Sequence, residues 1–240
     1  MGQAKILVGT PTYSGKFYCL SEWVENIQRL NYNNFDVLLV DNSKDDTYKK
    51  RIESLGVNCI KSDFVENQRE NLKNARNIFF EYALSHDYDY VLSVEQDVFP
   101  SANTLQTLLK HDKPIVGALY MLGQFADNKL RRKIDWICSC ADLKKTITLP
   151  DNNEAMYWLL LSEVQGKGLL QVRSCCFGCV LISSSTLHEI KPRVVSGLNR
   201  FDDYYFFEDC LKKNIPVYTD TDLLVNHYPG LGGGSGWMQL

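Results

Sequence analysis

The sequence lacks the features that mark several large classes of protein. Its first apolar run, residues 5–9, is too short for a secretory signal peptide or a membrane-spanning helix. No G-x-G-x-x-G motif follows this run, which argues against a dinucleotide-dependent oxidoreductase. No internal repeat and no low-complexity linker precede the Gly-rich tail. We therefore expect a cytoplasmic protein with one domain over residues 1–229 and a flexible tail at 230–240.

A strong excess of charge of either sign is also absent. The 240 residues include 26 Lys or Arg and 29 Asp or Glu, which gives a formal net charge of -3. This mildly acidic and mixed balance indicates neither a nucleic-acid partner nor contact with a membrane surface. The length and the 45% hydrophobic content allow a large core.

Cysteine is present, but not in a pattern that suggests disulfides. Eight cysteines in a chain far longer than a disulfide-stapled mini-domain agree with reduced thiols. Two groups have spacings that would suit zinc: Cys138 with Cys140, and Cys175 and Cys176 with Cys179. The second group leads into the apolar run 180–183, where small buried thiols are ordinary. The sequence does not decide between these two interpretations.

The first half of the chain alternates short apolar runs with amphipathic helical patterns. Apolar runs bounded by turn residues predict buried strands, and apolar residues at spacings of three and four predict helices. The predicted strands are 5–9, 37–40, 57–60 and 90–94, and the predicted helices are 20–30 and 75–83. Strands that alternate with helices predict an α/β fold with a mostly parallel sheet, covered on both faces.

The second half is less regular. Residues 115–120 predict a strand, and a long polar and aromatic stretch follows from about 124 to 172. Further strands are predicted at 180–183 and 216–218, with a short helix around 207–213. We therefore expect a Rossmann-like first half and a less regular C-terminal portion.

Two carboxylates follow the predicted strand 90–94. In an extended chain Glu95 and Asp97 point to the same side, while Gln96 points away. They lie at the carboxyl edge of the sheet, where open α/β sheets bind ligands. Mg²⁺ and Mn²⁺ prefer oxygen ligands and commonly take one or two carboxylates plus substrate phosphates. An isolated E-x-D is, however, also typical of a solvated strand end.

Polar residues end the other strands of this predicted sheet as well. Residues 10–13 follow the first strand and 41–43 follow the second. Because parallel strands bring these segments to one edge, a carboxylate, hydroxyls and backbone amides would meet there beside the two carboxylates that could bind a metal ion. Such an edge suits a nucleoside diphosphate.

The order of these segments resembles that of a GT-A glycosyltransferase, close to the large family-two group. GTPTYSGKFYCLSEWVENIQ is similar to its opening strand, loop and helix, and VLLVDNSKDDT to the strand that ends in an acidic nucleotide contact. NLKNARNIFFEYA resembles the helix with an Ala-Arg-Asn signature, SVEQDV the D-x-D metal motif, and FFEDCLKK the Glu-Asp helix start. Together these segments cover most of residues 4–228.

The resemblance implies a nucleotide site in about residues 1–120. Thr10, Pro11 and Tyr13 would line the base and ribose. Asp41 would accept a hydrogen bond from the base. Arg76 would contact the nucleotide or its phosphates, where a planar guanidinium suits bidentate binding. The implied nucleotide-binding residues are Thr10, Pro11, Tyr13, Asp41, Asn42, Arg76 and Gln96.

The resemblance also implies a divalent cation, Mn²⁺ or Mg²⁺. Asp97 would be its main ligand, Glu95 would assist on the metal or the ribose, and His227 would be a third metal-binding group. Glu95 stands where the family has its first Asp, which lengthens that arm. An isolated histidine is, however, more often structural or on the surface.

The implied catalytic pair is Glu208 and Asp209, which follows an aromatic run at 204–207. Asp209 would accept the proton of an attacking hydroxyl as general base. The alternative is a carboxylate that only complements a helix dipole.

The expected function is therefore that of a hexosyltransferase-like glycosyltransferase. It would move a sugar from a UDP- or GDP-linked donor to a carbohydrate, glycolipid or protein acceptor held by residues 121–229. A sugar-phosphate nucleotidyltransferase is an alternative, although GTPTYSGK has few glycines for its loop. An inert module that binds nucleotide sugars is another.

Overall fold

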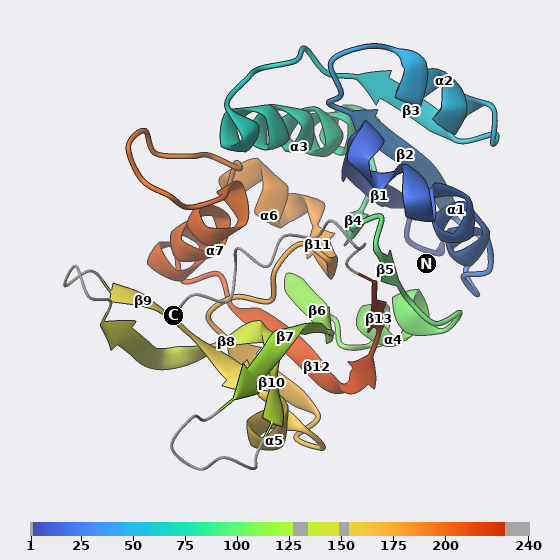
Figure 1. The fold of residues 1–240 in the computed structure, drawn as a ribbon. Coiled ribbons are helices and arrows are strands. Elements are labelled where there is room, and N and C mark those ends of the chain that lie inside the picture. The colour runs from blue at the N-terminus through green and yellow to red at the C-terminus, as the bar shows by residue number, and fades with distance from the viewer. Residues whose placement is uncertain (1, 127–133, 149–153, 229–240) are drawn as a thin grey trace.

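The framework of the molecule is an eight-stranded sheet with strand order β10-β12-β6-β11-β4-β1-β2-β3 (Figure 1). The computed structural model describes residues 2–126, 134–148 and 154–228. The strands are β1 (Ile6–Thr12), β2 (Phe35–Asp41), β3 (Asn58–Lys61), β4 (Tyr90–Val94), β6 (Ile115–Leu119), β10 (Leu169–Val172), β11 (Cys179–Ser183) and β12 (Val217–Leu224). All run in one direction except β10 and β11. The predicted α/β fold with a mostly parallel sheet is confirmed.

Helices cover both faces of this sheet. They are α1 (Leu20–Gln28), α2 (Thr47–Glu53), α3 (Gln68–Ser85), α4 (Thr104–Lys110), α5 (Leu161–Val164), α6 (Ser184–Glu189) and α7 (Asp202–Lys212), with a 3₁₀ helix η1 at Ser14–Cys19. Because side chains alternate along a strand, Leu38 and Val40 face the core under α3, α6 and α7. Leu39 faces the core under α1, α2 and α4. This two-sided burial explains the continuous apolar runs in the sequence.

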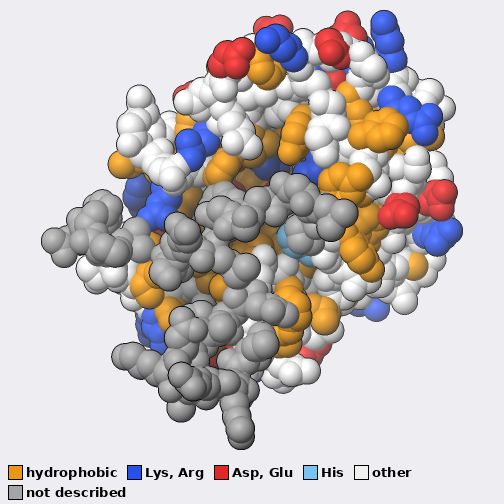
Figure 2. All heavy atoms as spheres, viewed as in Figure 1, with side chains coloured by type: hydrophobic (Ala, Val, Ile, Leu, Met, Phe, Trp, Pro, Cys, Tyr) orange, Lys and Arg blue, Asp and Glu red, His pale blue; other side chains and the backbone are white. Residues whose placement is uncertain are grey.

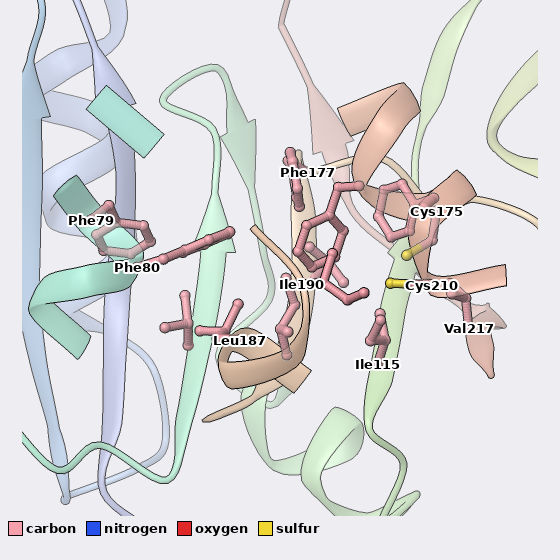
Figure 3. Packing of buried hydrophobic residues seen from close by; sticks show 14 of the residues in the cluster. Phe79, Phe80, Ile115, Cys175, Phe177, Leu187, Ile190, Cys210 and Val217 are labelled. Atoms are coloured by element: carbon pink, nitrogen blue, oxygen red, sulfur yellow. The ribbon is translucent and has the colours of Figure 1, made fainter. Parts of the chain in front are cut away.

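Aromatic rings fill the core between α3, α6 and α7 (Figure 3). The ring of Phe80, from α3, meets that of Phe177 edge to face at 5.8 Å, and Phe177 meets Phe206 of α7 at 5.1 Å. These rings are buried. They fix the start of α7 against α3, which determines where the first turn of α7 lies.

The stretch 124–172 contains more regular structure than its sequence indicates. β7 (Met121–Ala126), β8 (Ile134–Thr148) and β9 (Glu154–Leu160) form a three-stranded antiparallel sheet. Antiparallel strands can leave one face in water, so they need no continuous apolar run. The polar composition of this stretch therefore hid its strands.

Helix α7 begins at Asp202, whereas the sequence predicted a helix around 207–213. The aromatic run 204–207, which preceded the predicted helix, lies inside α7, where Tyr205, Phe206 and Phe207 are buried. Acidic residues in a first turn complement the helix dipole. In this helix they are Asp202 and Asp203, so the acidic helix start is six residues earlier than the Glu-Asp pair that the sequence indicated.

A short antiparallel pair joins the C-terminal segment to the end of β4. β5 (Val98–Phe99) pairs with β13 (Asn226–His227), and His227 stands opposite Val98. Tyr228 N also donates to Asp97 O at 2.8 Å. This pairing brings residue 227 beside residues 95–97. The tail at 230–240 lies outside the described residues.

No helix in the described part of the chain has both the length and the apolar character needed to span a membrane.

Candidate active site

The candidate site lies where β4 ends. The strand stops at Val94, and Val98 N donates to Glu95 O at 2.8 Å. Glu95 to Asp97 therefore form a turn, and the assumption of an extended chain for these residues was wrong. The two carboxylates are still neighbours. Desolvation raises the pKa of Glu95, and as a consequence of this closeness the negative charge of Asp97 raises it further. The side chain of Glu95 is 38% exposed.

Asp97 is the most constrained acid of the site, with 4% of its surface exposed. Its Oδ2 pairs with the Lys16 ammonium and lies 3.7 Å from Nε2 of His227. Its Oδ1 is buried and has no hydrogen-bond partner among the described residues. Burial favours the neutral acid, but His227 and Lys16 outweigh it and lower the pKa of Asp97 to about 2. Asp97 is therefore a carboxylate at neutral pH.

His227 is oriented by a second contact on its other nitrogen. Its Nδ1 lies 2.8 Å from Met121 O, and because a carbonyl only accepts, Nδ1 carries the proton. Nε2 is then directed to Asp97. Burial lowers the pKa of His227, but Asp97 and the Met121 carbonyl raise it above its usual value. The ring of Tyr120 packs against the imidazole at 5.5 Å.

The chemistry of this pair fits a divalent cation that completes its shell with other ligands. In the described ranges, no group of three or more His, Cys, Asp or Glu side chains could by itself hold a metal. Asp97 nevertheless offers a buried, unpartnered oxygen, and an oriented imidazole is beside it. Mg²⁺ and Mn²⁺ sites often use one or two carboxylates plus substrate phosphates. Glu95, Asp97 and His227, the three predicted metal residues, lie near enough for the charges of the other two to act on Glu95.

The predicted nucleotide-binding residues lie on the adjacent ends of β1 and β2. Thr12 and Asp41 stand opposite each other, with Thr10 and Pro11 on the same strand and Asn42 beyond β2. Asp41 is fully buried, and its Oδ1 accepts from Ser43 N at 2.9 Å. Its Oδ2 has no hydrogen bond from any described residue, although Lys61 Nζ is 3.4 Å away. Asn42 and Thr10 are also buried. Their contact with a nucleotide stays a prediction.

Gln96 lies beneath this edge and is 1% exposed. Its Nε2 donates to Lys16 O at 2.8 Å and lies 2.7 Å from the Tyr48 hydroxyl, and its Oε1 accepts from Thr12. The amide thus ties η1 to β1 and α2. A nucleotide contact by Gln96 stays a prediction, and these internal hydrogen bonds do not favour it.

Arg76 is buried as well, with 2% of its surface exposed. Its Nε donates to Asp202 Oδ2 at 2.7 Å, and its Nη2 lies 3.9 Å from Glu95 Oε1. The guanidinium also lies 4.3 Å over the Phe177 ring. Arg76 therefore links the end of β4 to the start of α7. Its predicted contact with the nucleotide finds no support in this position.

The predicted catalytic pair is held in ion pairs farther along α7. Glu208 makes two hydrogen bonds with Arg173, at 2.6 and 2.9 Å. Asp209 makes two with Arg193, at 2.5 and 2.9 Å, and the Arg193 guanidinium lowers the pKa of Asp209. A carboxylate stabilised in this way is a weak base. The role of Asp209 stays a prediction without support from these contacts.

Asp203, which the sequence did not single out, is the acid of α7 next to Glu95. Burial, the charge of Asp202 and that of Glu95 raise the pKa of Asp203 to about 7. Its Oδ1 accepts from Tyr204 N at 2.7 Å, at the first turn of the helix. The signal in the sequence was the pair of acids directly after Phe201, which is typical of a helix start.

Tyr120 is a buried residue close to Glu95 and Asp203. Its hydroxyl accepts from Gly178 N at 3.1 Å, and a Cβ on residue 178 would lie 2.2 Å from that oxygen. Burial, Cys176, Glu95 and Asp203 raise the pKa of Tyr120 well above its usual value. Tyr120 is therefore neutral, and position 178 requires glycine.

Exposed aromatic side chains flank the site. Tyr18 Oη donates to Tyr228 O at 3.1 Å, and the Tyr228 ring meets Phe99 at 5.4 Å. On the face seen in Figure 2, hydrophobic side chains gather near the middle, and charged ones stand mostly towards the edge. The exposed fractions are 47% for Tyr13, 60% for Phe17, 49% for Tyr18 and 60% for Tyr228. Aromatic faces suit bases and sugar rings.

The cysteines are all buried free thiols. Burial raises the pKa of Cys138 and of Cys179 to about 12, so both remain protonated at neutral pH. Zinc binds the thiolate form. In the described segments these thiols form no group that could hold a metal.

Comparisons with known proteins show the family and the fold. Residues 8–137, more than half of the chain, match the sequence profile described as Glycosyl transferase family 2. No curated protein sequence matches the chain.

Several solved structures share the fold at low sequence identity. S. aureus TarS 1–349 in complex with UDP-GlcNAc is 15% identical, with a TM-score of 0.56 over 96% of this chain and 61% of TarS. The mannosyltransferase PcManGT from Pyrobaculum calidifontis, in complex with GDP-Man and Mn²⁺, is 14% identical, with a TM-score of 0.59 over 99% and 60%. GalNAc-T7 with UDP, GalNAc and Mn²⁺ is 11% identical, with a TM-score of 0.65 over 97% and 45%. The chain thus spans between 45 and 61% of these proteins, and the GT-A fold expected from the sequence is confirmed.

Proposed function

Because the chain belongs to glycosyl transferase family 2, we propose that it transfers a sugar from a nucleoside-diphosphate sugar to a hydroxyl group of an acceptor. One observation carries this proposal. Around Glu95 the structure gathers Asp97 with His227, which suit a cation, and Asp203, which suits a base. A metal-binding carboxylate and a separate proton acceptor are the two groups that such a transfer needs.

Asp97 and His227 would hold Mn²⁺ or Mg²⁺, with Glu95 beside them. A bound divalent cation would stabilise the negative charge that develops on the departing diphosphate. The imidazole favours Mn²⁺ over Mg²⁺, because Mg²⁺ prefers oxygen ligands more strictly. The donors to be considered are UDP- and GDP-linked hexoses, since the solved structures of the same fold include complexes of both kinds.

Asp203 would accept the proton of the acceptor hydroxyl. A general base works best when its pKa lies near the working pH, and that of Asp203 is about 7. Arg76 and Asp202 position this residue, because their buried ion pair fixes the first turn of α7 against the end of β4. The raised pKa of Asp203 and the ion pair that lowers the pKa of Asp209 thus favour Asp203 over Asp209 as the base.

The acceptor would bind beside Asp203 and the exposed aromatic residues. A carbohydrate, a glycolipid or a protein side chain each presents a hydroxyl group, and the aromatic rings favour a sugar. The cytoplasmic location and the assignment of residues 121–229 to the acceptor stay predictions.

A nucleotide-release assay tests the proposal. The chain would be incubated with a panel of UDP- and GDP-linked sugars, with Mn²⁺, with Mg²⁺ and with EDTA. We expect release from donors of one base, loss of release with EDTA, and recovery after Mn²⁺ is added back. Equal release without metal would contradict the role of the cation, and a chain that binds no nucleoside diphosphate would contradict the whole proposal.

A further inference from the structure

Lys16 occupies a central position that neither the family signature nor the proposed mechanism uses. It belongs to η1, directly after β1, and its ammonium pairs with Oδ2 of Asp97. The backbone of Lys16 is fixed, because its N donates to Tyr13 O at 2.9 Å and its O accepts from Gln96 Nε2 at 2.8 Å. Its side chain is 25% exposed. The main chain is therefore anchored while the ammonium can move.

The two oxygens of Asp97 differ in their surroundings. Oδ2 has the Lys16 ammonium and the His227 imidazole, whereas Oδ1 has no hydrogen-bond partner in the described part of the chain. Lys16 thus neutralises a carboxylate that is almost completely buried and has Glu95 as a second negative neighbour. Without Lys16, the described residues would leave the Asp97 carboxylate with the His227 imidazole as its one cationic partner.

An ammonium and a divalent cation cannot both lie against one carboxylate without repelling each other. Repulsion between like charges a few ångströms apart is stronger near a protein than in bulk water, and a doubly charged ion increases it. A cation at Asp97 would therefore drive the ammonium away. The anion that would enter the site with the cation is the diphosphate of the nucleotide sugar. Lysine suits a phosphate, because its ammonium carries three N–H groups on a flexible stem.

We infer that Lys16 is the resident counter-ion of Asp97 and that it moves to the diphosphate of the donor when a divalent cation binds. This inference rests on the proposed function. It makes Lys16 a competitor of the cation in the empty site and a ligand of the nucleotide in the loaded one. Removal of its charge should therefore change the two affinities in opposite directions.

The test uses Lys16→Met, which keeps the length and the apolar stem and removes the charge. Mn²⁺ binding without nucleotide is measured from the electron paramagnetic resonance signal of free Mn²⁺. We expect Lys16→Met to bind Mn²⁺ about tenfold more tightly than the wild type, a factor that corresponds to ~1.4 kcal/mol. With Mn²⁺ saturating, calorimetric titration with UDP and with GDP should show about tenfold weaker binding of the nucleotide that the wild type prefers.

Two further variants keep the test decisive. Lys213→Met removes an equal charge from an ion pair with Glu189 on the surface, at 2.9 Å, and should change neither affinity. Lys16→Gln carries the same two predictions as Lys16→Met, so a folding defect in one variant does not remove the test.

The outcomes separate this inference from the proposed function. An unchanged or weaker Mn²⁺ affinity in both Lys16 variants would overturn the role as counter-ion. An unchanged nucleotide affinity would overturn the movement to the diphosphate. If the wild-type chain itself binds neither Mn²⁺ nor a nucleoside diphosphate, the proposed function fails instead.

Discussion

At the scale of single residues, the environment of each carboxylate decides what it can do. Asp97, Asp203 and Asp209 are the same residue type, yet their partners differ. Asp97 has a lysine and a histidine, Asp209 has two cations, and Asp203 has two other acids. Cations stabilise the charged form and acids the neutral form, so only Asp203 titrates near neutral pH.

The first prediction concerns the base. Asp203→Asn should lower the rate of transfer by about 10²–10⁴-fold, the usual contribution of a general base. Asp209→Asn, the matched control on the same helix, should keep most of the activity. In the wild type, kcat/KM should rise with pH up to about 7 and then level off, because Asp203 must lose its proton to act. A larger loss in Asp209→Asn than in Asp203→Asn would restore the assignment made from the sequence.

The same substitution should stabilise the folded chain. The Asp203 carboxyl has a reference pKa of 3.8 and a folded value of about 7, so the folded state keeps the proton longer than the unfolded state does. Its contribution to stability therefore falls as the pH rises through this window. Asp203→Asn should raise Tm by a few degrees at pH 8 and by almost nothing at pH 4, as thermal unfolding at the two pH values would show. An equal Tm at pH 8 would mean that Asp203 is not perturbed.

At the scale of elements, the sequence predicted strands better than helix starts. Buried parallel strands such as β1 and β4 are continuous apolar runs, and these can be recognised without any tertiary information. The start of α7 could not be recognised in this way, because its aromatic residues 204–207 favour strands by intrinsic propensity. Burial of Phe206 and Phe207 against α3 overrides that preference. The error displaced the acidic helix start, and the prediction of Asp209 as the base depended on that later start.

The link between α3 and α7 gives a prediction at this scale. Arg76→Met leaves Asp202, which is 1% exposed, without its partner in the core. Loss of one member of a buried pair costs about 3–5 kcal/mol of unfolding free energy. Arg193→Met, at a pair whose arginine is 42% exposed, should cost about 1 kcal/mol or less. Urea unfolding of both variants measures the difference, and equal losses would contradict the role given to Arg76.

At the scale of the whole molecule, the candidate site is assembled from distant parts of the chain. Lys16, Asp97 and His227 come from η1, the end of β4 and β13. The sequence alone placed Asp97 at a sheet edge because a strand ends there. It could not place Lys16, because nothing local to η1 shows that a residue 81 positions away is its partner. His227 was reached only through the family resemblance, since the short pairing of β5 with β13 has no recognisable pattern.

The most direct test of the central claim is a calorimetric titration of the chain with UDP and with GDP, with and without Mn²⁺, in the wild type and in Asp97→Ala. The account predicts that one of the two nucleotides binds the wild type in the presence of Mn²⁺. It also predicts that binding weakens at least tenfold when Mn²⁺ is removed or Asp97 is replaced. Binding of the same nucleotide with equal affinity in Asp97→Ala and in the wild type would contradict it.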